Sequence, residues 1–135
     1  MSTQIGINEK LISYLETIGY RSNGIIDKLV SETTALGSVA QMQIAPEQGQ
    51  FLEIIVKISQ SINCLEIGRF TGLSALCMAK GLPANGKIIA VDNSNEFLPM
   101  AEKYWKMAEV ESKIESIIGE GVEVMQSMID RQFTF

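Results

Sequence analysis

From residue 61 onward, short apolar runs alternate with segments of helical periodicity, and this alternation constrains the fold more than any other feature of the chain. Such an alternation is typical of βαβ units, in which a helix joins two parallel strands. Right-handed crossovers place the strands side by side in the order 3-2-1. The pattern predicts strands at 62–67, 87–92 and 113–118, and helices that end near residues 80, 108 and 129. Ser94 or Asn95 is expected to cap the second of these helices, and residues 133–135 are expected to open a fourth strand.

The first sixty residues have helical periodicity instead. Apolar residues recur at helical spacing after Asn8 and again after Asn23, which predicts two short amphipathic helices. Pro46 suits the first turn of a third helix over 46–60. We expect that helix to bury Phe51, Leu52, Ile55, Val56 and Ile58. The prediction is one domain over 1–135, with a helical layer at 1–60 and a βαβ half at 61–135.

Composition limits the chemistry. The sequence has no histidine, which excludes Ser-His-Asp and Cys-His nucleophilic catalysis, so catalysis would need carboxylates, lysine, a metal ion or positioning. A net charge of −5 gives no electropositive footprint, and we expect no DNA partner. Cys64 and Cys77 stand in apolar stretches and are predicted to be buried thiols. Without an apolar run of about 18 residues or a secretory start, we expect a cytoplasmic protein with no membrane partner.

A glycine-containing turn follows the first predicted strand, in the segment LEIGRFTGLS at 65–74. Such a turn lets a ligand approach the backbone at the carboxyl edge of the sheet. Asp92 ends the next strand, where a carboxylate can accept hydrogen bonds from a ribose. Taken alone, the glycines are more consistent with a simple turn, and Asp92 with a carboxylate that faces water. Together they predict a nucleoside-containing ligand.

The spacing of the glycines narrows the ligand. Gly68 and Gly72 form G-x-x-x-G, whereas the pyrophosphate fingerprint is G-x-G-x-x-G, so an oxidoreductase that uses a dinucleotide is only a minor alternative. Glu66, two residues before the first glycine, suits a ligand with a positive ammonium group better than one with two phosphates. S-adenosylmethionine is such a ligand.

Several ordered motifs carry a family resemblance: MQIAPEQGQFL at 42–52, LEIGRFTGLSAL at 65–76, IIAVD at 88–92, and the pair Tyr104-Trp105. Over roughly residues 8–135 the chain resembles the cation-dependent O-methyltransferases of the caffeoyl-CoA and catechol type, bacterial branch. The resemblance implies a Rossmann-like class I methyltransferase fold. It also implies methyl transfer from S-adenosylmethionine to a hydroxyl of a catechol-like or related small molecule. A divalent cation, usually Mg²⁺, would hold the acceptor oxygens, and the protein would be a homodimer.

The resemblance also implies a set of cofactor-binding residues. Glu66 would lie near the methionine end, Gly68 and Arg69 would contact the ligand through their backbone, and Ser74 would bond its carboxylate. Asp92 would hold the ribose. The remaining members are Met42 and Ile44, on a strip that closes over the cofactor, and Gly121, whose backbone would meet the adenine. Met42 and Ile44 can equally be core residues, Ser74 can satisfy its own backbone, and Gly121 can simply precede a helix. Tyr104 and Trp105 are interpreted as packing aromatics.

The chain departs from the family pattern at its end. Family members continue past the fourth strand into the segments that supply the metal ligands and a lysine, so the catalytic residues are expected beyond Phe135 and no metal site is expected within the chain. We therefore expect an incomplete sheet, truncated after the third strand, and a 135-residue chain that is inactive alone. The alternative to an enzyme is a cofactor-binding or oligomerising module without catalysis.

Overall fold

The computed structural model describes residues 6–132, and its centre is a parallel three-stranded sheet. The strands are β1 (Asn63–Ile67), β2 (Lys87–Asp92) and β3 (Ile114–Ile118), in the spatial order β1-β2-β3. In the register of the sheet, Leu65 pairs with Ile89, which in turn pairs with Glu115. The predicted α/β class and the predicted strand order are therefore confirmed. The fourth strand predicted at 133–135 lies outside the described residues.

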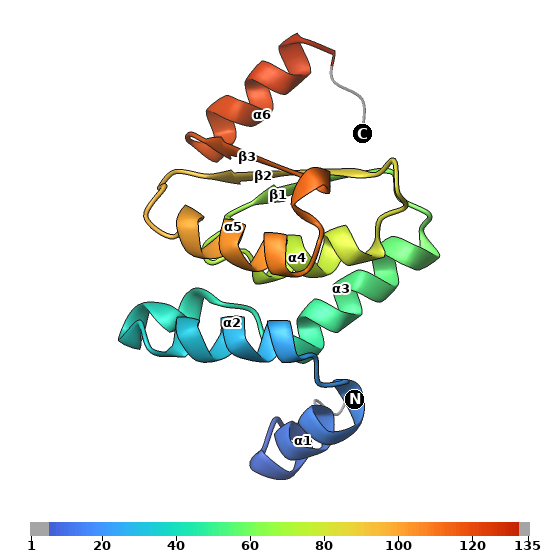
Figure 1. Cartoon of the computed structure of the whole chain (residues 1–135), viewed down its shortest axis with the longest axis vertical. Coiled ribbons are helices and arrows are strands. Elements are labelled where there is room, and N and C mark those ends of the chain that lie inside the picture. Colours follow the sequence, from blue (N-terminus) through green and yellow to red (C-terminus); the bar gives the residue numbers. More distant parts are fainter. Residues whose placement is uncertain (1–5, 133–135) are drawn as a thin grey trace, which may run out of the picture.

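Helices cover both faces of this sheet (Figure 1). Helices α4 (Leu73–Gly81) and α5 (Leu98–Met107) lie on one face, and α6 (Gly121–Asp130) lies on the other. A second helical layer, formed by α2 (Gly24–Thr34) and α3 (Pro46–Ile58), covers α4 and α5 on the side away from the sheet. The N-terminal α1 (Glu9–Tyr14) continues into a π-helical turn, η1 (Leu15–Gly19). Two short 3₁₀ turns, η2 (Gly37–Met42) and η3 (Glu111–Lys113), are the remaining elements of the described residues.

The core lies between the sheet and the α4–α5 layer. It contains the small and branched side chains of α4 and β2, such as Leu76 and Ile88, which are fully buried. Tyr104 and Trp105 of α5 are buried in the same cluster, so their interpretation as packing aromatics is confirmed. Cys77 is buried as predicted, whereas Cys64 is only partly buried because β1 is an edge strand among the described residues.

Local capping explains where the helices begin. The Asn8 side chain accepts a hydrogen bond from Leu11 N, and the Asn23 side chain accepts one from Ile25 N, so both asparagines satisfy free N–H groups of a first turn. The cap predicted for α5 at Ser94 or Asn95 is wrong. Ser94 Oγ instead accepts from Glu96 N in a turn, and the helix starts only at Leu98.

The prediction for α3 was partly wrong. Its buried side consists of Gly49 and Val56, which face α4. Phe51, Ile55 and Ile58, which were expected in the core, are 58%, 44% and 75% exposed. Helical periodicity identifies an apolar face but not the element that covers it. Within residues 6–132 no element covers this one.

The division at residue 60 stays a prediction, although α2 and α3 both pack on α4. Within the described part of the chain, no helix combines the length and the apolar character that crossing a membrane would require.

Candidate functional site

The turn between β1 and α4 forms the centre of the candidate site. Gly68 follows β1 with a φ of +92° and donates its N–H to Val91 O at 2.8 Å, so the turn is fastened to the end of β2. A Cβ atom added at Gly68 would meet no atom within 4 Å. The backbone is therefore open on this side, in a conformation that favours glycine.

Two hollows meet at Gly68. The first, the edge hollow, has a volume of about 270 Å³ and crosses the carboxyl ends of all three strands; it is lined by Ile67, Gly68, Val91, Asp92, Asn93, Gly119, Glu120 and Gly121. The second, the turn hollow, has a volume of about 50 Å³ and is lined by Met42, Gln43, Ile44, Gly68, Arg69, Phe70, Thr71, Leu73 and Ser74. Seven of the eight residues predicted as cofactor-binding line one or the other. The eighth, Glu66, hydrogen-bonds to Ser74. The sequence-predicted residues are thus brought together, and their contact with a ligand stays a prediction.

Glu66 is a buried carboxylate with one unused oxygen. Its side chain comes from β1, and the residue is only 9% exposed. Ser74 Oγ donates a hydrogen bond to Glu66 Oε1, whereas Oε2 is buried without a partner among residues 6–132. Burial raises the pKa of Glu66 to about 7, against the opposing effects of the Ser74 hydrogen bond and the charge of Arg69. A buried acceptor without a donor is costly, so this oxygen favours a cationic donor from a ligand.

Asp92 fixes the turn as well as lining the edge hollow. Its Oδ2 accepts hydrogen bonds from Arg69 N and Phe70 N, both at 2.9 Å, and its Oδ1 accepts from Ser94 N at 2.9 Å. Burial acts to raise the pKa of Asp92, but these three N–H donors hold it below its ordinary value, so the side chain is a carboxylate at neutral pH. An ionised carboxyl group has about four acceptor positions, so about one remains for a ligand hydroxyl. No motif in the sequence predicted this structural role of Asp92.

The Arg69 side chain is a site feature that the sequence reasoning missed. The residue was expected to act through its backbone, but its guanidinium is buried, with the residue 1% exposed. It donates to Ser116 Oγ at 2.6 Å and to Ser94 O at 2.8 Å, and its Nε has no partner among the described residues. One arginine thereby joins the turn to β3 and to the segment after β2. A single arginine in a turn gives no sequence signal for such burial.

Two further glycines near the site, Gly72 and Gly121, allow close packing. A Cβ at Gly72 would lie 2.7 Å from both Ala101 Cβ and Trp105 Nε1, and Trp105 Nε1 donates to Gly72 O at 2.9 Å. A Cβ at Gly121 would lie 2.6 Å from Ile67 Cγ2, so this glycine lets α6 approach β1 closely. Of these three glycines, Gly68 is the one at which an added Cβ would meet no atom within 4 Å, so its Cα side is open to a ligand.

Metal-ligating side chains do not gather in the part of the chain that the structure describes: no group of three or more Cys, Asp or Glu residues there could hold an ion. The carboxylates at this end of the sheet are instead engaged separately. Glu120 accepts from Asn93 Nδ2 at 3.4 Å, and Asp92 holds the turn.

The chain is similar in sequence to known O-methyltransferases over most of its length. The family described as O-methyltransferase matches residues 16–135. Over 120 residues the chain is 37% identical to caffeoyl-CoA O-methyltransferase 1 of Nicotiana tabacum, with 86% of this chain and 48% of that protein covered. It is 26% identical over 117 residues to catechol O-methyltransferase of Niastella koreensis, with 85% of this chain and 51% of that protein covered. The chain thus spans about half the length of the curated relatives it matches.

The fold comparison agrees. The crystal structure of an O-methyltransferase from Bacillus cereus in complex with SAH superposes with a TM-score of 0.77, at 23% sequence identity. The match covers 87% of this chain and 53% of that one. At this level of identity the likeness establishes the Rossmann-like fold.

Proposed function

The chain belongs to the O-methyltransferase family, and from this premise we propose that the whole protein transfers a methyl group from S-adenosylmethionine to a hydroxyl of a catechol-like or related small molecule, with help from a divalent cation. The observation that carries the proposal is the strand-turn-helix segment at 63–74, where two hollows meet beside a buried carboxylate oxygen that has no donor among residues 6–132. Relatives named as caffeoyl-CoA and catechol O-methyltransferases support the acceptor class.

The residues of the turn hollow fit the methionine end of the cofactor. Glu66 Oε2 has no donor in the described part of the chain, and an ammonium group would be one; its charge-assisted hydrogen bond would stabilise the ionised carboxylate. Ser74 Oγ donates its one hydrogen to Glu66, which orients that carboxylate, so in this arrangement the hydroxyl can accept from the ligand's ammonium but does not donate to the ligand's carboxylate as predicted. Met42 and Ile44, which line the same hollow, would provide an apolar contact. Their partly open position suits residues that close over a ligand.

The residues of the edge hollow fit the nucleoside. The remaining acceptor position of Asp92 would take a ribose hydroxyl, and the open side of Gly68 would let the ligand lie against the backbone. Gly121 begins α6 at the end of this hollow, where its backbone would meet the base. Because α6 starts without a side-chain cap, its first N–H groups remain available.

S-adenosylmethionine, when bound, supplies a methyl group on a positively charged sulfonium. The described residues contribute binding and orientation: the two hollows fix the ends of the ligand, and orientation of this kind lowers barriers by up to about 7–11 kcal/mol. Residues 6–132 do not provide a metal-binding group, so the cation belongs to the proposal for the whole protein and no step is derived through it. A homodimer is also proposed, supported by the resemblance and by the exposed apolar residues of α3.

Calorimetric titration with S-adenosylhomocysteine tests the binding part of the proposal. We expect saturable binding, weakened about tenfold or more in Glu66→Gln, because the amide cannot provide the charge. Glu115→Gln is the matched control, since this glutamate lies exposed on β3 and should leave affinity unchanged. Mass spectrometry of catechol incubated with the whole protein, S-adenosylmethionine and Mg²⁺ tests the transfer. A folded protein that binds neither form of the cofactor would refute the proposal.

A further inference from the structure

A further hollow lies away from the proposed cofactor site. This loop pocket has a volume of about 530 Å³ and is formed where the segment from η1 to α2 crosses α3, with the end of α4 closing it. Lys80 of the loop pocket lies near the C-terminus of α4, whereas Ser74 of the turn hollow lies near its N-terminus. Six residues at a rise of 1.5 Å each place them about 9 Å apart along the helix axis. The loop pocket shares no lining residue with the edge hollow or the turn hollow.

Side-chain hydrogen bonds hold the wall of the loop pocket in place. Gln50 of α3 accepts from Arg21 N at 2.8 Å through Oε1 and donates to Gly19 O at 3.1 Å through Nε2. Tyr20 and Ser22 both donate to the Asp27 carboxylate, at 2.7 Å and 2.6 Å. The segment that carries Arg21 is therefore fixed to α3 on one side and to α2 on the other. The wall of the loop pocket is therefore held in place before a ligand binds, as is usual for small-molecule pockets.

The charge of the loop pocket is opposite to that of the chain. The whole sequence has a net charge of −5 and only 11 basic residues, yet Arg21, Lys57 and Lys80 all line this pocket, against the single carboxylate of Glu53. Glu53 pairs with Lys57 at 2.6 Å and with Lys80 at 3.2 Å. Burial acts to raise the pKa of Glu53, but hydrogen bonds from the two lysines hold it below its ordinary value. The residues that line the pocket thus have two positive charges in excess; the Asp27 carboxylate, which accepts hydrogen bonds from Tyr20 and Ser22, is not one of them.

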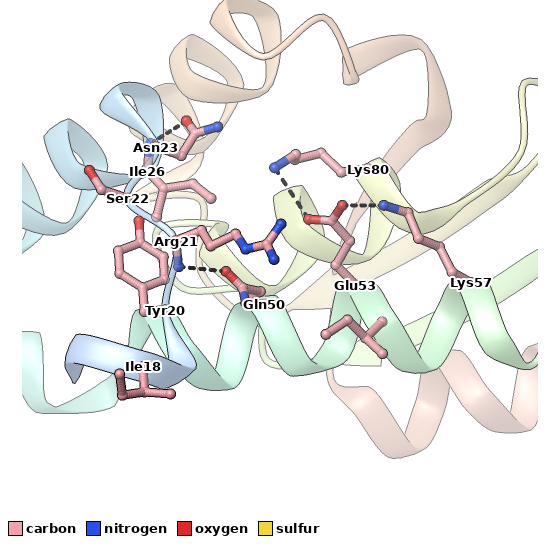
Figure 2. A pocket seen from close by; sticks show the side chains of 11 residues that line it. Ile18, Tyr20, Arg21, Ser22, Asn23, Ile26, Gln50, Glu53, Lys57 and Lys80 are labelled. Atoms are coloured by element: carbon pink, nitrogen blue, oxygen red, sulfur yellow. Dashed lines mark hydrogen bonds and ion pairs between the residues drawn. The ribbon is translucent and has the colours of Figure 1, made fainter. Parts of the chain in front are cut away.

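The Arg21 guanidinium is the cation of this group without a counter-ion. Figure 2 shows it pointing from the loop toward Glu53, but within residues 6–132 no carboxylate lies in ion-pair distance of it. Lys80, at the longer distance from Glu53, lies on the opposite wall. A planar guanidinium binds two oxygens of a phosphate at once, and an ammonium supplies a point charge to a third. Ile18, Ile26 and Ile54 add apolar contacts in the same pocket.

We propose that the loop pocket binds a small organic phosphate, whose dianion lies between Arg21 and Lys80 and whose apolar part contacts the isoleucines. A phosphomonoester has a charge near −2 at neutral pH, which matches the excess of the lining. A carboxylate would neutralise only half of that excess. The volume of about 530 Å³ suits a small molecule. The proposal is independent of the cofactor site, because no residue is common to both.

Nuclear magnetic resonance of the ¹⁵N-labelled protein, titrated with phenyl phosphate, tests this proposal. We expect amide shifts concentrated at Arg21, Ile26 and Lys80, with none at Gly68. Arg21→Gln and Lys80→Gln should each weaken binding about five- to tenfold, since each removes a charge-assisted contact at a partly exposed site. The control Lys106→Gln removes the same charge from the exposed side of α5 and should bind like the unmodified protein.

Two further ligands separate the phosphate from its alternatives. Phenol should bind at least tenfold more weakly than phenyl phosphate, because it lacks the dianion. Addition of 0.3 M NaCl should lower the affinity for phenyl phosphate several-fold. Equal response to phenol and phenyl phosphate would overturn the proposal in favour of an apolar hollow. Equal affinity of Arg21→Gln, Lys80→Gln and Lys106→Gln would overturn it in favour of nonspecific charge attraction. Binding of S-adenosylhomocysteine, measured in parallel, should be unaffected by all three substitutions.

Discussion

The pH dependence of cofactor binding follows from the environment of Glu66. In the free protein, burial raises the pKa of this carboxyl group to about 7. A ligand ammonium at Oε2 favours the ionised form, so the pKa falls in the complex and binding below pH 7 releases a proton. If the ionised form alone binds, its population falls from about 90% at pH 8 to about 9% at pH 6. Affinity for S-adenosylhomocysteine should therefore weaken about tenfold over this range, equivalent to about 1.4 kcal/mol.

Calorimetry in buffers of different ionisation enthalpy measures both quantities. We expect proton release that approaches one per site near pH 6 and vanishes at pH 8. Glu66→Gln should abolish the pH dependence between 6 and 8, whereas Glu115→Gln should keep it. The same loss of affinity between pH 8 and pH 6 in Glu66→Gln as in the unmodified protein would refute this role of Glu66.

The same carboxyl group affects stability with the opposite sign. A folded-state pKa of about 7, above the ordinary 4.5, means that the folded protein holds the proton more tightly. This contribution to the free energy of unfolding is complete below pH 4.5 and is lost as pH rises through 7, by up to about 3 kcal/mol. Glu66→Gln, which cannot ionise, should therefore stabilise the protein at pH 8 while it weakens ligand binding. Denaturant unfolding at pH 5 and pH 8 measures the difference, which should shrink in the variant.

Three other expectations concern the turn and its supports. Asp92→Ala should weaken S-adenosylhomocysteine binding about ten- to a hundredfold by calorimetry, and it should also destabilise the fold, because three N–H groups lose their acceptor. Gly72→Ala should lower the free energy of unfolding by about 2–4 kcal/mol, since its Cβ would meet Ala101 and Trp105 at a positive φ; Gly24→Ala, with open space and ordinary φ, is the control. Gly68→Val should abolish binding and retain the helix signal in circular dichroism, and an unfolded variant would show that this glycine is structural first.

The sheet and its strand order could be predicted because, over residues 61–132, the hydrophobic periodicity and the positions of the turn residues indicate the same elements. Each strand is a short, mostly apolar run, and α4 and α6 follow turns that contain glycine, whereas α5 follows a turn without glycine or a side-chain cap. The edge where Gly68 and Asp92 meet follows from parallel connectivity alone, since carboxyl ends of parallel strands share one edge. Elements fixed by tertiary partners were less predictable. The buried side of α3 depends on Gly49, where an added Cβ would lie only 2.8 Å from Cys77 Sγ. No local sequence pattern predicts this close contact.

The side-chain hydrogen bonds that hold the turn could not be predicted from the sequence for a related reason. Asp92 and Arg69 are separated by 23 residues, and their interaction joins a carboxylate to a backbone N–H, which leaves no complementary pair of residue types to recognise. The network nevertheless explains why the turn can serve a ligand. Asp92 holds Arg69 N and Phe70 N, and the Arg69 guanidinium holds Ser116 and Ser94, so the open backbone at Gly68 is fixed before a ligand arrives. Such preorganisation lowers the conformational cost of binding. Asp92, the carboxylate best placed for a ribose, therefore also holds the turn in place. Its substitution will remove a contact with the ligand and, at the same time, the hydrogen bonds that order the turn.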